Sequence, residues 1–94
     1  VAPLPDLLSI RLWEMLAERY RDEPAVLFDL FNEPHDPLPD DLHPLVRPDG
    51  VLYPPGHRTV TMADWQPWAE RLIAAIRSRG ARNLIFVSGV NWGY

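Results

Sequence analysis

Apolar residues recur at three- and four-residue steps in two long stretches of the chain, and a short, mostly apolar run follows each stretch. The first stretch predicts an amphipathic helix from about Asp6 to Tyr20. The run after it, Ala25 to Phe31, is bounded by Pro24 and Pro34 and contains β-branched and aromatic residues. Such a run is typical of a buried parallel strand. The first unit is therefore predicted to be a helix, a short loop and a strand.

The second unit repeats this order. Thr61 or Asp64 is expected to cap a second helix, which tolerates Pro67 only if this proline lies in the first helical turn. Gly80 fits the carboxyl end of that helix, and Leu84 to Val87 is typical of another short buried strand. Alternating helices and strands build a parallel sheet through right-handed crossovers. We therefore predict the α/β class, in the order helix, strand, helix, strand.

Two strands cannot cover both faces and both edges of their sheet, so this pair needs neighbouring strands to be stable. The chain opens on Val1 and stops at Tyr94, a few residues after the second strand. We interpret residues 1–94 as part of a larger barrel or sheet. The first residues lack the layout of a signal peptide, and no run approaches the roughly 20 apolar residues of a membrane span. If the start of the protein is missing from this sequence, the lack of a signal-peptide layout does not decide whether the protein is exported.

Composition excludes several classes of function. The chain has no cysteine, which excludes disulfides and thiol catalysis, and its net charge of -4 argues against a nucleic-acid partner. It also lacks a glycine-rich phosphate loop and the Gly-x-Ser-x-Gly elbow of serine hydrolases. No cofactor or metal is expected, because the candidate ligands show no recognisable metal-binding spacing: His35, Asp36, Asp40, Asp41, His43 and His57.

The segment 35–63 is a long Pro-rich loop with no clear period. It is much longer than the usual strand-to-helix connection of about 2–6 residues. Because it starts at the carboxyl end of the first strand, one interpretation makes it a wall of a substrate cleft. The other makes it a decoration without substrate contact. Both interpretations stay open.

Polar residues at the carboxyl end of the first strand are the best candidates for chemistry. Active sites of parallel α/β folds are built there, and Asn32-Glu33 directly follows the apolar run. A glutamate at such a rim suits general acid catalysis of glycoside cleavage, with Asn32 holding a sugar hydroxyl. Asp29 shares the parity of Glu33 and is either buried against a cation or hydrogen-bond donor from an absent strand or hydrated near the rim. Trp92, after the second strand, either stacks on a sugar ring or belongs to the core.

These residues resemble a known family. Phe28-Asp29-Leu30-Phe31-Asn32-Glu33-Pro34-His35 resembles the fourth-strand signature of family 5 glycoside hydrolases, the cellulase family. The preceding helix with Trp13 and Tyr20-Arg21-Asp22, the following helix, and the later Trp92 are similar to that family too. The resemblance implies a (β/α)8 TIM barrel, with this chain covering about the third helix to the fifth strand. Residues 1–94 would then be a partial catalytic domain.

The resemblance also implies a function. It indicates a retaining β-glycoside hydrolase, similar to an endo-β-1,4-glucanase, that acts on a polysaccharide or oligosaccharide outside the cell. Glu33 would be the general acid/base and Asn32 would bind the sugar 2-hydroxyl, with Trp92 and His35 as further substrate-binding candidates. The family's nucleophile, on a later strand, has no counterpart in this chain. The 94 residues alone are therefore expected to be inactive.

Two alternatives stay open at this point. The first keeps the same chemistry but moves it to mannan or xylan, which the Pro-rich loop and the other strands of the barrel would decide. The second is a carbohydrate-binding or structural half-barrel without catalysis, which self-associates to cover the edges of its sheet. Trp13, Trp65 and Trp68, which lie on the predicted helices, are expected to be packing residues in either case.

Overall fold

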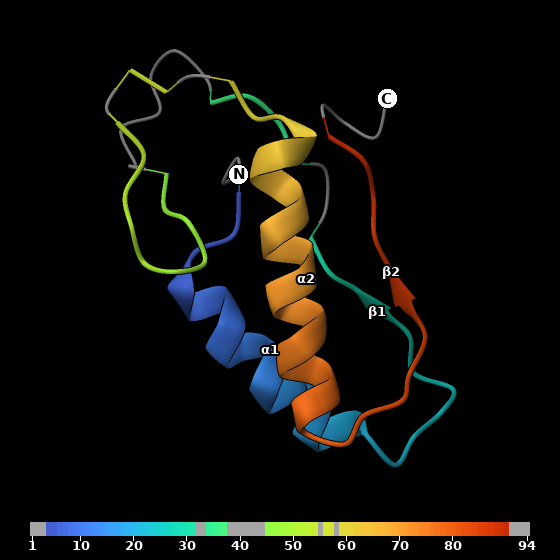
Figure 1. The fold of residues 1–94 in the computed structure, drawn as a ribbon. Coiled ribbons are helices and arrows are strands. Elements are labelled where there is room, and N and C mark those ends of the chain that lie inside the picture. Colours follow the sequence, from blue (N-terminus) through green and yellow to red (C-terminus); the bar gives the residue numbers. More distant parts are fainter. Residues whose placement is uncertain (1–3, 32–33, 38–44, 55, 58, 91–94) are drawn as a thin grey trace.

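The computed structural model describes residues 4–31, 34–37, 45–54, 56–57 and 59–90. Along the chain, the elements are α1 (Leu7–Tyr20), β1 (Phe28–Asp29), α2 (Met62–Ser78) and β2 (Ile85–Phe86), arranged as in Figure 1. The strands pair in parallel, with Phe28 opposite Ile85 and Asp29 opposite Phe86. The predicted order and the parallel pairing are confirmed.

The helices begin at residues that satisfy their first backbone donors. At α1, the Ser9 backbone N–H donates to the Asp6 carboxylate at 3.2 Å, and the Asp6 N–H donates to the Ser9 hydroxyl at the same distance. At α2, both predicted cap candidates take part. Thr61 is the N-cap, and its backbone N–H donates to the Asp64 carboxylate at 3.0 Å. At the other end of α2, Gly80 adopts a φ of 79°, which favours glycine.

The expectation for Pro67 is wrong. This proline is the sixth residue of α2 and lies in its second turn, where it removes the backbone donor to the Ala63 carbonyl. The helix continues because this position faces solvent: Ala63 and Pro67 are exposed and line a surface pocket together with Tyr53. Water can therefore replace the missing donor, which a buried position would not permit.

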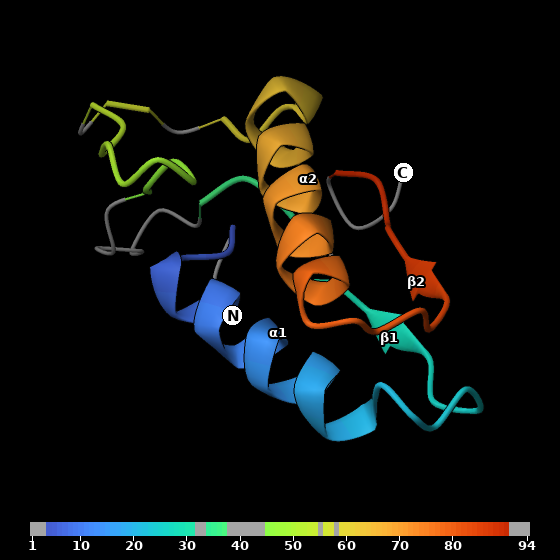
Figure 2. The same cartoon turned by 60° about the horizontal axis from the view of Figure 1, so that its bottom comes forward.

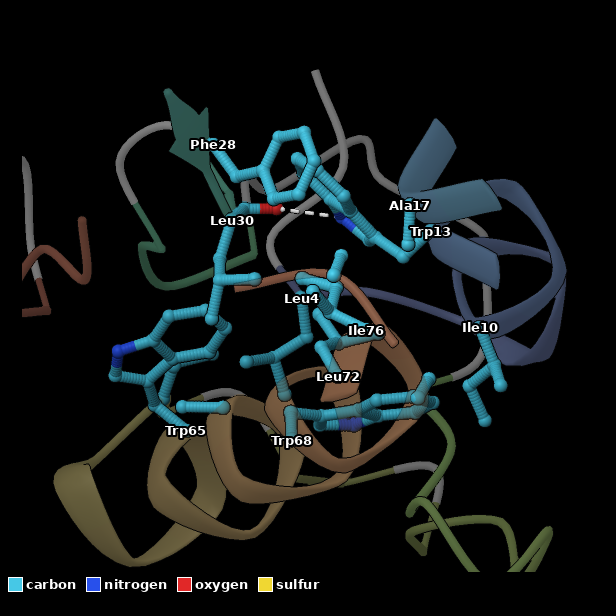
Figure 3. Close-up of a cluster of buried hydrophobic side chains, with 14 of the residues drawn as sticks. Leu4, Ile10, Trp13, Ala17, Phe28, Leu30, Trp65, Trp68, Leu72 and Ile76 are labelled. Carbon is cyan, nitrogen blue, oxygen red and sulfur yellow. Dashed lines mark hydrogen bonds between the residues drawn. The ribbon is translucent and has the colours of Figure 1, made fainter. Parts of the chain in front are cut away.

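The core lies between the two helices and one face of the strand pair (Figures 2 and 3). Trp65, Trp68, Leu72 and Ile76 of α2 are fully buried, and the ring of Trp13 meets the edge of Phe28 at 5.3 Å between centroids. The expectation that the three helix tryptophans are packing residues is confirmed. At the surface, Arg79 joins the helices through a 2.7 Å salt bridge to Glu14.

The outer face of the strand pair is not covered by any described residue. Phe28 and Leu30 are buried against the helices, whereas the apolar side chains of the opposite parity remain exposed: Leu27 at 49%, Leu84 at 67% and Phe86 at 55%. This agrees with the expectation that two strands cannot cover both faces of their sheet and need neighbouring strands. The physical reason is that two strands and two helices make only two layers, so one sheet face lacks a neighbour.

Part of the Pro-rich loop folds into a small hairpin. Val46 and Leu52 form an antiparallel bridge, and Gly50 turns the chain with a φ of 89°. The indole N–H of Trp68 donates to the Val46 carbonyl at 2.9 Å, which fixes the hairpin to α2. Figures 1 and 2 both show this hairpin on the side of α2 away from the strands. This arrangement favours a decoration of the helix layer for residues 45–53.

Candidate active site

Asn32, Glu33 and Trp92 lie outside the described residues, so their roles stay predictions. The structure does describe the frame on both sides of Asn32-Glu33. Phe31 comes just before this pair, and Pro34 comes just after it. The candidate site can therefore be built from the groups that hold these two neighbours.

Two side chains hold the carbonyl groups of the two residues that follow β1. The indole N–H of Trp13 on α1 donates to the Leu30 carbonyl at 3.1 Å, as Figure 3 shows. The hydroxyl of Ser88, which follows β2, donates to the Phe31 carbonyl at 3.1 Å. The chain is thus fixed from α1 and from the β2 side immediately before Asn32-Glu33.

The chain is also fixed after the pair. Pro34 and His35 are buried, and the Asp36 carboxylate accepts the Val60 backbone N–H at 2.7 Å. This hydrogen bond ties the segment after Glu33 to the start of α2. The His35 side chain is only 1% exposed, and this burial favours a supporting role over a direct sugar contact.

Asp29 lies on the uncovered face of the strand pair. Its parity differs from that of Phe28 and Leu30, which face the helices, and its side chain is exposed. Solvent therefore hydrates this carboxylate in the described chain. Both alternatives for Asp29 stay open, because the partner predicted for a buried Asp29 would come from a strand outside this chain.

A second cluster of polar side chains surrounds Asp64 at the start of α2. Its carboxylate accepts the Thr61 N–H and lies 3.1 Å from Nε2 of His57, whose ring stacks on Tyr53. Burial acts to raise the pKa of Asp64, but hydrogen bonds from Thr61, His57 and Tyr53 outweigh it and lower the pKa below 3.8. The pKa of Tyr53 is raised above 10.0 by burial, then by its hydrogen bond to Asp64 and the charge of that carboxylate.

These two shifts predict how stability varies with pH. A lowered acid pKa stabilises the fold above pH 3.8, and this contribution is lost as pH falls through the folded value. A raised tyrosine pKa stabilises the fold below pH 10.0, and this contribution is lost as pH rises. Urea unfolding from acid to alkaline pH is expected to show both losses. Tyr53→Phe should reduce the loss of stability at alkaline pH and leave most of the loss of stability at acidic pH. An unchanged loss of stability at alkaline pH would contradict this.

A sequence model of the family described as Cellulase (glycosyl hydrolase family 5) matches residues 9–94. The chain belongs to glycosyl hydrolase family 5. This confirms the resemblance drawn from the strand motif. Neither the curated proteins nor the solved structures contain a match.

Membership of family 5 gives the chain a glycoside hydrolase lineage and indicates a carbohydrate substrate. The family implies a (β/α)8 barrel, and the two helices and two parallel strands are compatible with part of one. Among the described residues, neither helix is long and apolar enough to cross a membrane. No group of three or more His, Asp or Glu side chains in that part of the chain is arranged to hold a metal ion.

Sequence reasoning missed two residues that fix the strand pair of this family 5 chain, one at each end. Ser88 holds the end of β1, and Asn83, which is buried, donates its amide hydrogens to carbonyls of the α1–β1 connection. The sequence marks each only as a small polar residue beside an apolar run. Their partners lie 57 to 63 positions away, so no local pattern reveals them.

Proposed function

We propose that this chain is part of a retaining β-glycoside hydrolase of the endo-β-1,4-glucanase type, with Glu33 as its general acid/base. The observation that supports the proposal is the position of the Asn32-Glu33 motif after the first strand. In a chain of family 5, two residues separate Asn32-Glu33 from the end of the strand β1, which pairs in parallel with β2. The carboxyl ends of parallel strands are where barrel enzymes build their active sites.

In the proposed reaction, Glu33 protonates the glycosidic oxygen as the bond to the sugar breaks. A second carboxylate attacks the sugar carbon and forms a glycosyl-enzyme intermediate, and Glu33 then takes a proton from the water that hydrolyses it. Retention requires the two carboxyl groups to lie about 5 Å apart. The described glutamates lie on helices or before β1: Glu14, Glu18, Glu23 and Glu70. We therefore place the nucleophile on a strand outside this chain.

The uncovered sheet face supports this larger assembly. Leu27, Leu84 and Phe86 lie exposed beside Asp29 on the face opposite to the helices. In a barrel, the face opposite to the helices points inward and is covered by the other strands. We propose that these side chains belong to such an interior. The substrate is then a polysaccharide met outside the cell, with mannan or xylan as alternatives to a β-glucan.

The same uncovered face favours one other candidate, a non-catalytic half-barrel that pairs with a second copy. The solution mass of the purified 94-residue chain separates the two proposals. A folded dimer without activity would favour the half-barrel. A monomer, or a chain that does not fold by itself, would favour a barrel completed by residues outside this chain.

The reaction class is tested by the stereochemistry of the products. The enzyme that contains this chain is incubated with cellopentaose, and the first anomer released is identified by proton NMR. A retaining enzyme releases the β anomer first, and this is the expected result. The α anomer appearing first would contradict the proposed mechanism. Parallel incubations with mannopentaose and xylopentaose decide between the polysaccharides.

The 94-residue chain by itself is expected to show no turnover, because double displacement needs both carboxylates. The measurement uses the purified chain and an aryl β-cellobioside, with release of the phenol followed over a day. Turnover that Glu33→Gln abolishes would show that the chain carries its own nucleophile. That result would remove the need for a second carboxylate from outside.

A further inference from the structure

The end of β1 is held by a series of hydrogen bonds that starts on α2. The indole N–H of Trp65 donates to the Ser88 carbonyl at 2.8 Å, and the Ser88 hydroxyl donates to the Phe31 carbonyl at 3.1 Å. The rings of Trp65 and Phe31 also meet, with 5.9 Å between centroids. Trp65 is fully buried, so its place is fixed by the core. The series therefore transmits the position of α2 to the last residue before Asn32.

This connection stands where the regular ladder between the strands ends. The Leu30 backbone N–H donates to the Phe86 carbonyl at 3.2 Å, and one residue later the Ser88 side chain supplies the donor for Phe31. A side-chain donor fixes the direction of the Phe31 peptide without requiring the strand to continue. The chain can thus leave the sheet at a defined angle while the Phe31 carbonyl keeps a hydrogen-bond donor.

We propose that Ser88 is a positioning residue for Glu33. The hydroxyl fixes the Phe31 peptide, which sets the direction of the two following residues and so the distance from the Glu33 carboxyl group to the glycosidic oxygen. A proton donor acts only within hydrogen-bonding reach, and a displacement of about 1 Å can cost about 100-fold in rate. The inference rests on the proposed role of Glu33 as acid/base.

The test compares Ser88→Ala with Ser88→Thr in the enzyme that contains this chain. Threonine keeps the hydroxyl, whereas alanine removes it. The probes are phenyl and 2,4-dinitrophenyl β-cellobioside, because phenol needs protonation to leave and dinitrophenol does not. For Ser88→Ala we expect kcat/KM to fall about 10- to 100-fold on the phenyl substrate and less than about 3-fold on the dinitrophenyl one. Ser88→Thr should restore most of the loss.

Ser78→Ala is the matched control. Its hydroxyl also donates to a backbone carbonyl, that of Ala75 at 2.7 Å, but it lies at the far end of α2 from the candidate site. Both alanine variants should lower the melting temperature by a few degrees, since each removes one hydrogen bond. Only Ser88→Ala should shift the alkaline limb of the kcat/KM profile, because only it alters the surroundings of the acid.

The outcomes separate this inference from the proposed function. An equal loss on both substrates, an unshifted alkaline limb, or no rescue by threonine would overturn the positioning role of Ser88. Glu33→Gln is measured on the phenyl substrate in parallel with Ser88→Ala. If Glu33→Gln keeps normal activity, the proposed function fails, and the inference about Ser88, which rests on it, fails with it. If it is inactive while Ser88→Ala behaves as wild type, only the inference about Ser88 fails.

Discussion

Glu33→Gln is expected to reduce kcat/KM for phenyl β-cellobioside about 10²- to 10⁴-fold, which is the usual contribution of a general acid. Glutamine has nearly the same shape as glutamic acid but cannot give a proton to the leaving oxygen. The melting temperature should stay close to that of the unmodified enzyme. The measurement is initial-rate kinetics on the enzyme that contains this chain, accompanied by thermal unfolding of the same samples.

The leaving group gives this prediction a sharper form. With 2,4-dinitrophenyl β-cellobioside, the first step needs no acid, so Glu33→Ala should still form the glycosyl-enzyme intermediate. Hydrolysis of the intermediate should then be slow, because the base that activates water is missing. Azide needs no such base and should restore turnover, with β-glycosyl azide as the product. This product identifies Glu33 as the acid/base and excludes it as the nucleophile.

Glu23→Gln provides the matched control. It makes the same chemical change at an exposed residue in the connection between α1 and β1, at the other end of the strand from Glu33. Its kinetics on both substrates should equal those of the unmodified enzyme. A similar loss in Glu23→Gln and Glu33→Gln would point to a general effect of lost negative charge. Formation of α-glycosyl azide would assign Glu33 the role of nucleophile instead.

The elements of this fold could be predicted because their signals are local. Helix α1 follows from the spacing of apolar residues between Asp6 and Tyr20, and the end of α2 follows from the conformational freedom of Gly80. The motif around Glu33 was recognised in the same way, and the family match confirms the resemblance. Each of these signals lies within a few consecutive residues.

The rest depends on contacts between distant segments. The exposure of Leu84 and Phe86 could not be read from their apolar character, because burial depends on whether another layer covers them. The helical position of Pro67 depends on its exposure to solvent at the hairpin side of α2, and the role of Ser88 depends on a carbonyl 57 positions away. Sequence patterns describe which face of an element is apolar, but not what packs on it.

Asn83→Asp is expected to destabilise the fold by about 3 kcal/mol or more at pH 7, the cost of burying a charge without a partner. The Asn83 amide nitrogen donates to the carbonyl oxygens of Tyr20, Glu23 and Val26 at 3.3, 3.0 and 2.8 Å. These bonds tie the start of β2 to the connection between α1 and β1. Aspartate would place a carboxylate oxygen among three carbonyl oxygens, and the side chain is only 4% exposed.

Acidic pH should reduce this cost. The surrounding carbonyl oxygens and the burial raise the pKa of the new carboxyl group, so the folded variant binds its proton more tightly than the unfolded chain does. The contribution of this group to the stability of the variant is then fully present below the unfolded pKa of about 3.9 and is lost as pH rises through the folded value. The difference between Asn83→Asp and the unmodified protein in urea unfolding should therefore shrink from pH 7 to pH 4.

Two control variants separate the charge from the lost hydrogen bonds. Asn83→Ala removes the amide without adding a charge and should cost about 1–3 kcal/mol with little change between pH 7 and pH 4. Ala74→Glu adds a negative charge at an exposed position of α2 and should cost less than about 1 kcal/mol. If Asn83→Asp is no worse than Asn83→Ala at pH 7, the three carbonyl oxygens do not enclose the side chain in solution. Contacts other than the Asn83 amide would then have to hold the connection between α1 and β1. In the structure this amide joins that connection to the start of β2.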